Sequence, residues 1–465
     1  MRQLIAILLI ATALLGCDPL ANPVTGPVAF SSDTVSFDTV FSTVGSVTME
    51  FRAINRGNDP LQIDRIYLGG GTGSPFRLNI DGVPSVSSEE VILAQGDSLF
   101  VFVDVTIDPL NEVNPVAVLD SVVFESGSFT DRVILEAWGQ DIWLLEDEVT
   151  GTATWTEGKP YVISGSFIVD TLAVLVMTPG TRVYFHHNAS MTVAGTMITA
   201  GDVEKPVVFA SDRLEEGYKD VPGYWKGITF LDISQNNVLE STDIRNAEIS
   251  VRLNGSESNK PDILLGKVSL MHNSVASLVA RNANVLAVNS LFSHSGFSTV
   301  SLTEGGTYDF IHCTMANRWE YSFRSEPVMF IGKGAGVLPE VSVVNTVISG
   351  TLNNELVLDA VPSEVSARFY ADSSIIKVDT TGSAWYVSGL FKEVQTTPLP
   401  RYIDESAYDY RPDTLSPLLD IAGRSEAISW PLDIRNMPRP TGSGPDIGAY
   451  ERQLGEKKKA LGNRL

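Results

Sequence analysis

The chain has 465 residues, with 33 Lys and Arg against 56 Asp and Glu, a formal net charge of -23 at pH 7. This length is about three times that of a usual domain and predicts more than one structural unit. The negative charge argues against nucleic acid or another polyanion as a partner. A hydrophobic fraction of 43% excludes a disordered chain, and 38 Gly with 24 Pro predict many turns.

The N-terminus has the pattern of a secretory signal. Arg2 precedes an apolar run at residues 4–15, which is too short to cross a membrane as a stable helix. The run ends in Leu14-Leu15-Gly16-Cys17, which resembles a bacterial lipobox, although Leu15 is bulkier than usual there. The resemblance implies a signal peptide at residues 1–16 and acylation of Cys17, with the lipid anchoring the protein in a membrane. The alternative is an ordinary secretory signal with an incidental cysteine.

The cysteine count favours the lipid interpretation. The only other cysteine is Cys313, so acylation of Cys17 leaves no partner for a disulfide. We expect Cys313 to be a small buried apolar residue. Residues 17–28 contain three prolines and predict an extended tether, and residues 452–465 form a basic, solvated tail.

Residues 29–141 show a period of two. Apolar residues alternate with polar ones at Leu99, Val101, Val103, Val105 and Ile107, the pattern of a half-buried strand. Short strands of this kind, separated by glycine- and asparagine-rich corners, predict a β-sandwich of Ig size.

Several segments of this region also resemble the Ig-like modules of the hydin and choice-of-anchor type, which often follow a bacterial lipidation site. They are residues 37–41, 55–57, 61–63, 75–78 and 138–141. The resemblance covers about a quarter of the chain and implies nothing about catalysis.

Beyond residue 142 a different repeat appears. Pairs of apolar residues flank one outward residue at intervals of 24, 21 and 21 residues, namely Val183-x-Phe185, Val207-x-Phe209, Ile228-x-Phe230 and Ile249-x-Val251. Repeats of this length cannot bury their own apolar face, so they must stack into a solenoid. We expect β coils, with Val183, Val207 and Ile228 one above another in a single aliphatic ladder.

Small polar pairs followed by an apolar residue mark a recurrent corner farther along the chain. They are Asn273-Ser274-Val275, Asn289-Ser290-Leu291, Cys313-Thr314-Met315, Asn345-Thr346-Val347 and Ser373-Ser374-Ile375. Asparagine at such a corner can adopt the left-handed conformation and bond to its neighbours above and below. The irregular intervals between these pairs predict loops of variable length between coils.

This region resembles the right-handed parallel β-helix of the pectin lyase-like superfamily. Its opening coils resemble those of secreted bacterial β-helix proteins, and its end resembles the closing segment of choice-of-anchor Q proteins; the segments are residues 178–185, 193–196, 205–209, 225–228, 433–435 and 445–451. Asn436 stands where that closing pattern often has Gly. The predicted fold is therefore all-β, with an Ig-like β-sandwich at residues 29–141 and a right-handed parallel β-helix at residues 142–451.

Enzymes of this superfamily that cleave acidic polysaccharides hold calcium with carboxylates on adjacent coils. Asp232, Glu240, Asp243 and Glu248 do not follow the repeat, so we expect a solvated face there. The Asn-Thr-Asp, Asp-Asp and Gly-His-Gly signatures of the related hydrolases are absent from this region. No metal, cofactor or catalytic residue is predicted, and calcium enters only if the protein is a lyase.

The first candidate binding cluster is an insertion between two coils that contains Asp212, Arg213 and Trp225. The two charged side chains could hold a sugar hydroxyl or carboxylate, and Trp225 could stack on a pyranose ring. The alternative is structural: Arg213 pairs with a nearby acid to hold the loop, and Trp225 covers the edge of the core.

The second candidate cluster contains His312, Arg318 and Trp319. His272 and His312 are expected to be equivalent positions two repeats apart, about 10 Å from each other and too far apart to share one metal.

These patterns predict a lipid-anchored cell-envelope protein, on the outer membrane, whose β-helix binds a polysaccharide or an envelope protein without catalysis. One alternative is a polysaccharide lyase or glycoside hydrolase acting on the flank of the β-helix. Another is a purely structural role.

Overall fold

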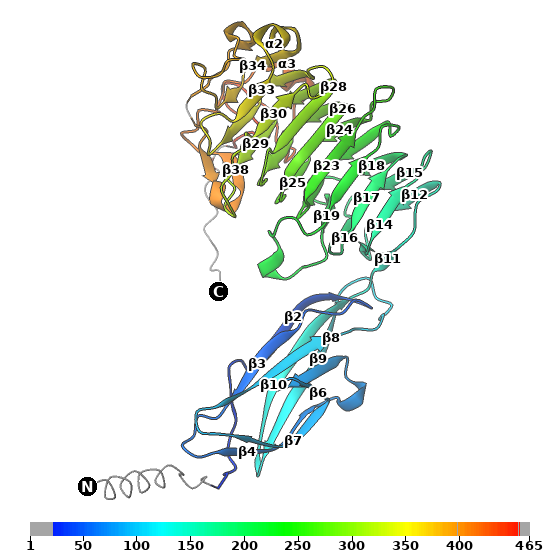
Figure 1. The fold of residues 1–465 in the computed structure, drawn as a ribbon, viewed down its shortest axis with the longest axis vertical. Coiled ribbons are helices and arrows are strands. Elements are labelled where there is room, and N and C mark those ends of the chain that lie inside the picture. The colour runs from blue at the N-terminus through cyan, green and yellow to red at the C-terminus, as the bar shows by residue number, and fades with distance from the viewer. Residues whose placement is uncertain (1–21, 398, 454, 456–465) are drawn as a thin grey trace, which may run out of the picture. The chain divides into compact units, whose positions relative to one another are not determined.

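The computed structural model describes residues 22–397, 399–453 and 455. By its internal contacts the chain divides into two units, Met1–Ile142 and Trp143–Leu465 (Figure 1). Within the described residues, no helix is long and apolar enough to cross a membrane. The predicted signal peptide, Cys17 and most of the basic tail lie outside the described residues.

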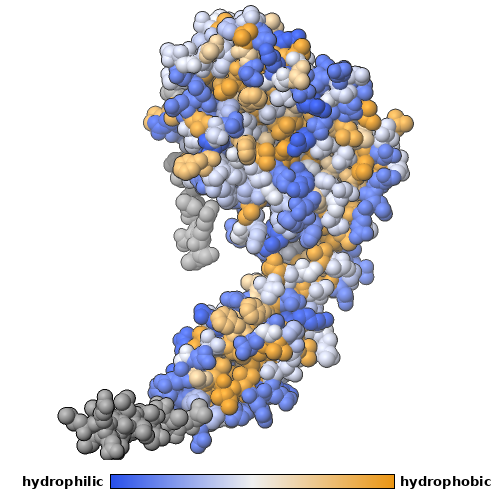
Figure 2. All heavy atoms as spheres, viewed as in Figure 1, coloured by the Kyte–Doolittle hydropathy of each residue, from blue (hydrophilic) through white to orange (hydrophobic). Residues whose placement is uncertain are grey.

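The first unit is a sandwich of two five-stranded sheets. One sheet has the order β1 (Ala29–Phe30), β3 (Met49–Ile54), β8 (Ser98–Val105), β5 (Phe76–Ile80), β6 (Val83–Pro84). The other has the order β2 (Thr34–Phe41), β10 (Phe129–Gln140), β9 (Val116–Ser126), β4 (Leu61–Leu68), β7 (Ser87–Leu93). The predicted period of two is present: the alternate residues Leu99, Val101, Val103 and Val105 of β8 enter the core between the sheets. Figure 2 shows apolar side chains gathered on the visible face of this unit.

The second unit is a solenoid in which each coil contributes three strands. Equivalent strands of successive coils pair in parallel, so the solenoid has three faces, each a parallel sheet. Face 1 is a ten-stranded sheet: β11 (Trp143–Leu145), β13 (Tyr161–Ile163), β16 (Arg182–Phe185), β19 (Val207–Ser211), β22 (Thr242–Arg245), β25 (Ser269–Met271), β27 (Leu291–Ser293), β29 (Thr314–Asn317), β32 (Val347–Gly350), β35 (Ile375–Ile376).

Face 2 contains β14 (Ser166–Val169), β17 (Ser190–Val193), β20 (Gly227–Phe230), β23 (Ile249–Asn254), the first parts of β26 (Ala276–Val288) and β28 (Val300–Ile311), β30 (Met329–Gly332) and β33 (Leu356–Asp359). Face 3 contains β12 (Thr152–Trp155), β15 (Val174–Met177), β18 (Thr196–Ala200), β21 (Asn237–Glu240), β24 (Asp262–Gly266), the second parts of β26 and β28, β31 (Glu340–Val344), β34 (Phe369–Asp372) and β36 (Phe391–Lys392). The predicted all-β fold of an Ig-like sandwich followed by a parallel β-helix is thus confirmed.

The predicted ladder of the β-helix is wrong in detail. Val183 of β16 pairs with Phe209 of β19, and Val207 pairs with Thr242, all on face 1. Ile228 lies on face 2, where it pairs with Met191 and Val251. All three predicted residues are fully buried in one core, but Val207 and Ile228 belong to different faces of the same coil. The predicted solenoid is therefore correct, but the sequence repeat was assigned to the wrong strands.

The corner between face 3 and face 1 is short and regular. From β21 onward, one residue with positive φ turns the chain at this corner in six successive coils: Ser241, Lys267, Asn289, His312, Asn345 and Ser373. The predicted corner is wrong at two coils. Thr314 pairs with Val347, which aligns His312-Cys313 with Asn345-Thr346, one residue earlier than predicted. Asn273-Ser274-Val275 follows β25 and lies at the corner between face 1 and face 2 instead. Cys313 is fully buried, and burial raises the pKa of its thiol to about 12.

The C-terminal segment packs on the outside of face 1 and covers this corner. It contains β37 (Tyr402–Asp404), β38 (Asp409–Pro412) and α3 (Arg424–Ser429). Leu418 and Ile447 form a small core with Val347 and Ile375 of face 1. Asn345 exchanges hydrogen bonds with the backbone of Gly423, and Arg439 reaches Asn289 at 3.3 Å. We call residues 289, 312, 345 and 373, together with the C-terminal segment that covers them, the covered corner.

At the C-terminal end of the solenoid the core is completed by irregular chain. The short helix α2 (Pro362–Arg368) places Val365 in the core, and Trp385 from a later turn is also buried there. Trp385, Tyr386 and Phe391 pack against one another. These apolar side chains replace the next coil, which would otherwise be needed to cover the last rung.

Candidate ligand-binding site

Two long loops project from the corner between face 1 and face 2, which we call the open corner. Residues 212–226 connect β19 to β20, and residues 318–328 connect β29 to β30. They carry the two clusters that the sequence presents separately, and they leave strands that are four positions apart in face 1. The loops meet where the Tyr321 hydroxyl donates to the backbone oxygen of Asp220 at 3.3 Å.

The first loop is held along the corner by buried polar contacts. The Asn246 side-chain amide donates to the carbonyl oxygens of Lys219 at 2.9 Å and Val221 at 3.0 Å. Gly223 has a φ of 78°, and an added Cβ there would lie 2.5 Å from the Ser274 hydroxyl. The loop therefore runs close against the next coils and is not a free flap.

Asp212 faces inward from the base of this loop. Its side chain is 5% exposed, and its Oδ2 lies 2.7 Å from Nδ1 of His186, whose side chain is 51% exposed. Burial and the charge of Asp212 raise the pKa of Tyr224 to about 12. Asp212 is therefore placed to orient His186 rather than to meet a ligand itself.

Arg213 is used within the loop, as the structural alternative expects. Its Nε donates to both carboxylate oxygens of Glu215 at 3.1 Å. Its guanidinium also lies 3.6 Å from the centre of the Tyr218 ring. These contacts hold the loop and leave less of the cation to meet a ligand.

Trp225 is not a ligand-binding residue. It is fully buried, its ring stacks on Phe185 with centroids 3.8 Å apart, and its Nε1 donates to the backbone oxygen of Arg245 at 2.9 Å. Stacking of Trp225 on a sugar ring is excluded because both its ring face and its polar atom are used inside the protein.

His312 is likewise buried and cannot contact a ligand. It is fully buried at the covered corner, and its Nε2 lies 3.0 Å from the Asn345 side-chain amide. Burial, with the nearby Arg439 guanidinium, lowers the pKa of His312 well below its usual range. His272 lies at the open corner, so the expected equivalence of His272 and His312 is wrong.

Arg318 and Trp319 both keep part of their side chains accessible on the second loop. Arg318 pairs with Glu320 at 3.3 Å, with almost half of the arginine side chain exposed. Trp319 is half-buried: its Nε1 donates to the Ser322 hydroxyl at 2.9 Å, and its ring centre lies 5.0 Å from that of Tyr321.

Three further exposed aromatic side chains lie on the second loop and on the neighbouring coil. Tyr321 is 58% exposed, Phe323 is fully exposed, and Phe297 from the neighbouring coil is 56% exposed. Gly296 allows the Trp319 ring to pack beside that coil, since an added Cβ would lie 3.2 Å from its Cζ2. We call Phe297, Trp319, Tyr321 and Phe323 the aromatic shelf. Exposed aromatic rings on anchored loops are typical of a surface that binds a partner or ligand.

Beneath the two loops lies a pair of histidines of which the sequence identified only one. His272 and His294 have ring centroids 5.3 Å apart, and the Tyr408 ring lies edge-on to both at 4.5 and 4.4 Å. Nε2 of His272 lies 3.4 Å from a carboxylate oxygen of Asp220. Burial lowers the pKa of His272 to about 4 and, together with the neighbouring His272, that of His294 to about 3. Both imidazoles are therefore neutral at pH 7.

The four acidic residues of the middle coils do not form a row. Asp232 follows face 2, Glu240 lies on face 3, Asp243 on face 1, and Glu248 at the open corner. Glu240 and Glu248 pair with Lys267 and Lys226, respectively. Among the described residues, no group of three or more His, Cys, Asp or Glu side chains is arranged to hold a metal ion.

Comparison with known proteins gives only distant likenesses. No family model matches the chain, and no curated protein matches it. A PapD-like domain of human CEP192 is similar with a TM-score of 0.18 and 12% identity, over 27% of this chain and 92% of that domain. The YadV chaperone gives 0.17 and 15%, over 24% of this chain and 51% of that one.

A family 123 glycoside hydrolase from Clostridium perfringens, studied for hydrolysis of glycolipid glycans, gives a TM-score of 0.18 and 5% identity. It covers 28% of this chain and 30% of its own. At these scores, none of the likenesses carries an argument about what this chain binds.

Proposed function

We propose that this protein is a lipid-anchored cell-envelope protein whose pectin lyase-like β-helix binds a glycan at the open corner without cleaving it. The aromatic shelf is the observation that supports glycan binding at this corner. Its exposed rings offer flat apolar faces to the C–H face of a sugar ring, and the half-exposed guanidinium of Arg318, next to Trp319 in the chain, could contact hydroxyl groups.

The binding test is calorimetric titration of the purified protein with a panel of neutral and acidic oligosaccharides, with and without calcium. Trp319→Ala and Tyr321→Ala should each weaken binding by about tenfold, which corresponds to about 1.4 kcal/mol. Phe129→Ala is the matched control, because Phe129 is a comparably exposed aromatic residue on the sandwich unit. Unchanged binding in both shelf variants would exclude this site.

The anchor is tested separately. Replacing Cys17 with Ser should abolish incorporation of labelled palmitate and move the protein from the membrane fraction to the soluble fraction. Retention of the label in the Cys17→Ser variant would remove the lipid from the proposal. Protease accessibility on intact cells then shows which face of the envelope the protein occupies.

The enzymatic alternative rests on one observation, the pair formed by His186 and Asp212. A buried carboxylate that accepts from Nδ1 orients an exposed imidazole so that Nε2 can take a proton, as in a general base. If the protein is a lyase or hydrolase, the glycan panel should yield new reducing ends or unsaturated products, and His186→Ala should abolish them. If binding is its only activity, no products form.

A further inference from the structure

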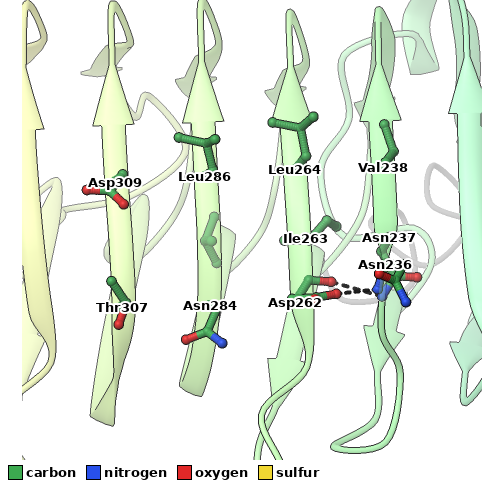
Figure 3. Close-up of a pocket in the computed structure, with 11 residues that line it drawn as sticks. Asn236, Asn237, Val238, Asp262, Ile263, Leu264, Asn284, Leu286, Thr307 and Asp309 are labelled. Atoms are coloured by element: carbon green, nitrogen blue, oxygen red, sulfur yellow. Dashed lines mark hydrogen bonds between the residues drawn. The ribbon is translucent and has the colours of Figure 1, made fainter.

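A groove lies on the outside of face 3 (Figure 3). It has a volume of about 610 Å³ and follows β21, β24 and the second parts of β26 and β28 across four successive coils. Nothing in the sequence pattern singled it out, because its residues alternate with the core residues of ordinary strands.

Strand register sorts the outward side chains of the groove into two parallel rows. Asp262, Asn284 and Thr307 are paired neighbours and form a polar row. Two residues farther along the same strands, Val238, Leu264 and Leu286 form an aliphatic row that ends at Asp309. Both rows face outward because residues two apart in a strand share a face.

Three polar side chains of this groove make no hydrogen bond among the described residues. Within the described part of the chain, no hydrogen bond is made by the side-chain amide of Asn284, the hydroxyl of Thr307 or the carboxylate of Asp309. Asp262 accepts from the backbone N–H of Asn236 through one oxygen. By contrast, the inward-facing Asn237 is fully bonded to its neighbours. Several hydrogen-bonding groups beside half-buried aliphatic side chains are typical of a binding site.

The spacing and charge of the groove select the ligand. Neighbouring strands place one polar group about every 4.8 Å along the solenoid axis, close to the length of one sugar unit in an extended chain. Asp262, Asp309 and the nearby Glu340 would repel uronate, sulfate or phosphate groups. Burial, together with Glu340, raises the pKa of Asp309. An extended peptide finds no free strand edge, because the backbone groups here pair from coil to coil.

We propose that the face 3 groove is a second binding site, which takes a neutral, extended glycan chain lying along the solenoid axis across four coils. The polar row bonds to hydroxyl groups of successive sugars, and the aliphatic row packs against their C–H faces. This site does not depend on the aromatic shelf, which lies at a different corner of the coils.

The test is calorimetric titration of the purified full-length protein with β-1,4-linked glucose, mannose and xylose oligomers, from disaccharide to hexasaccharide. Affinity should rise with length up to about the tetrasaccharide, since the groove spans four coils. Asn284→Ala and Thr307→Ala should each lower the affinity about tenfold, because each removes hydrogen bonds to the sugar. A β-1,4-linked glucuronic acid oligomer should bind more weakly than its neutral counterpart.

Matched controls come from the same coils. Asn254→Ala and Thr303→Ala remove the same side-chain types from outward positions of face 2, and Thr303 lies on β28 together with Thr307. Both controls should bind as the unchanged protein does. Thermal unfolding of all four variants should agree within the few degrees expected of surface substitutions.

Three results would overturn the inference: no neutral oligomer binds, Asn284→Ala and Thr307→Ala bind like their controls, or the glucuronic acid oligomer binds as well as the neutral one. The shelf variants keep the two sites apart. If Trp319→Ala abolishes all binding while the groove variants do not alter it, the groove proposal fails and the open corner stands. If the groove variants abolish all binding and Trp319→Ala does not alter it, the groove site is supported and the aromatic shelf is excluded as a binding site.

Discussion

The covered and open corners of the β-helix contain similar residue types in different surroundings. At the covered corner, His312 and Asn345 are fully buried under the C-terminal segment and bonded within the protein. At the open corner, loops of variable length carry exposed aromatic rings above a buried histidine pair. Residue type at a coil corner therefore does not decide whether a side chain stays exposed; the length of the loop and the segment that covers it do.

The largest expected effect is at the covered corner. Arg439 is buried, pairs with Glu451 at 3.3 Å and donates to the backbone oxygen of Gly448 at 2.8 Å. Replacing it with Ala leaves a buried carboxylate without its cation, so Arg439→Ala should cost about 3–5 kcal/mol of unfolding free energy. Urea unfolding followed by tryptophan fluorescence measures this. A loss below about 1 kcal/mol would show that the C-terminal segment is not held by this pair.

A comparable loss is expected where a buried ring supports the open corner. Trp225→Ala should destabilise the protein by about 3–5 kcal/mol, because it empties the space beside Phe185. Trp319→Ala is the matched control at the same corner and should cost less than about 1 kcal/mol while weakening glycan binding. Equal losses in the two variants would contradict the division between a structural and an exposed tryptophan.

Acid should weaken the open corner through the histidine pair. The folded-state pKa values of His272 and His294, about 4 and about 3, lie below the ordinary value of 6.5. Their contribution to stability is therefore present above pH 6.5 and is lost as the pH falls through 4 and then 3, amounting to a few kcal/mol in total. Asp220, Arg245 and Arg318 are the charged groups whose electrostatic effects reach the pair.

The measurement is the urea midpoint between pH 7.5 and pH 4. Replacing both histidines with Asn should flatten the decline, since Asn246 already adopts the same left-handed conformation one coil earlier. The exposed His187→Asn variant should keep the decline of the unchanged protein. A double variant that loses stability as steeply as the unchanged protein would exclude this pair as the cause.

The smallest effect concerns the surface ion pair of Arg318 and Glu320. Both side chains are about half exposed, so Arg318→Ala should change the unfolding free energy by less than about 1 kcal/mol. The same variant should weaken glycan binding if the guanidinium contacts the ligand. Loss of more than about 2 kcal/mol of stability would place Arg318 in the scaffold instead.

The sequence pattern was sufficient to predict the fold, but it did not predict which strands of the β-helix pair with one another. The alternation in β8 and the stacked apolar pairs reflect burial, which is local along a strand and visible in the sequence. The interval of 21 residues between Val207 and Ile228 was misleading, because residues 212–226 form a long loop inside one coil. All three faces bury the same kinds of side chain, so spacing alone cannot assign a strand to a face.

The candidate site was predictable only in parts. Both loops stand out in the sequence by their polar and aromatic content, but their contact through Asp220 and Tyr321 depends on how far each loop reaches along the corner. Trp225 and Trp319 are indistinguishable by type and differ in which one covers the core. His272 and His294 are 22 residues apart, close to one coil, and that interval was the signal that could have revealed the pair.

Under the proposed function, a glycan binds at the open corner and not at the covered one. Hydrogen–deuterium exchange, with and without the tightest binder of the oligosaccharide panel, tests it most directly. Bound glycan should slow exchange in residues 212–226 and 318–328 and leave residues 433–451 unchanged. Protection confined to residues 433–451, or no protection by any member of the panel, would contradict it.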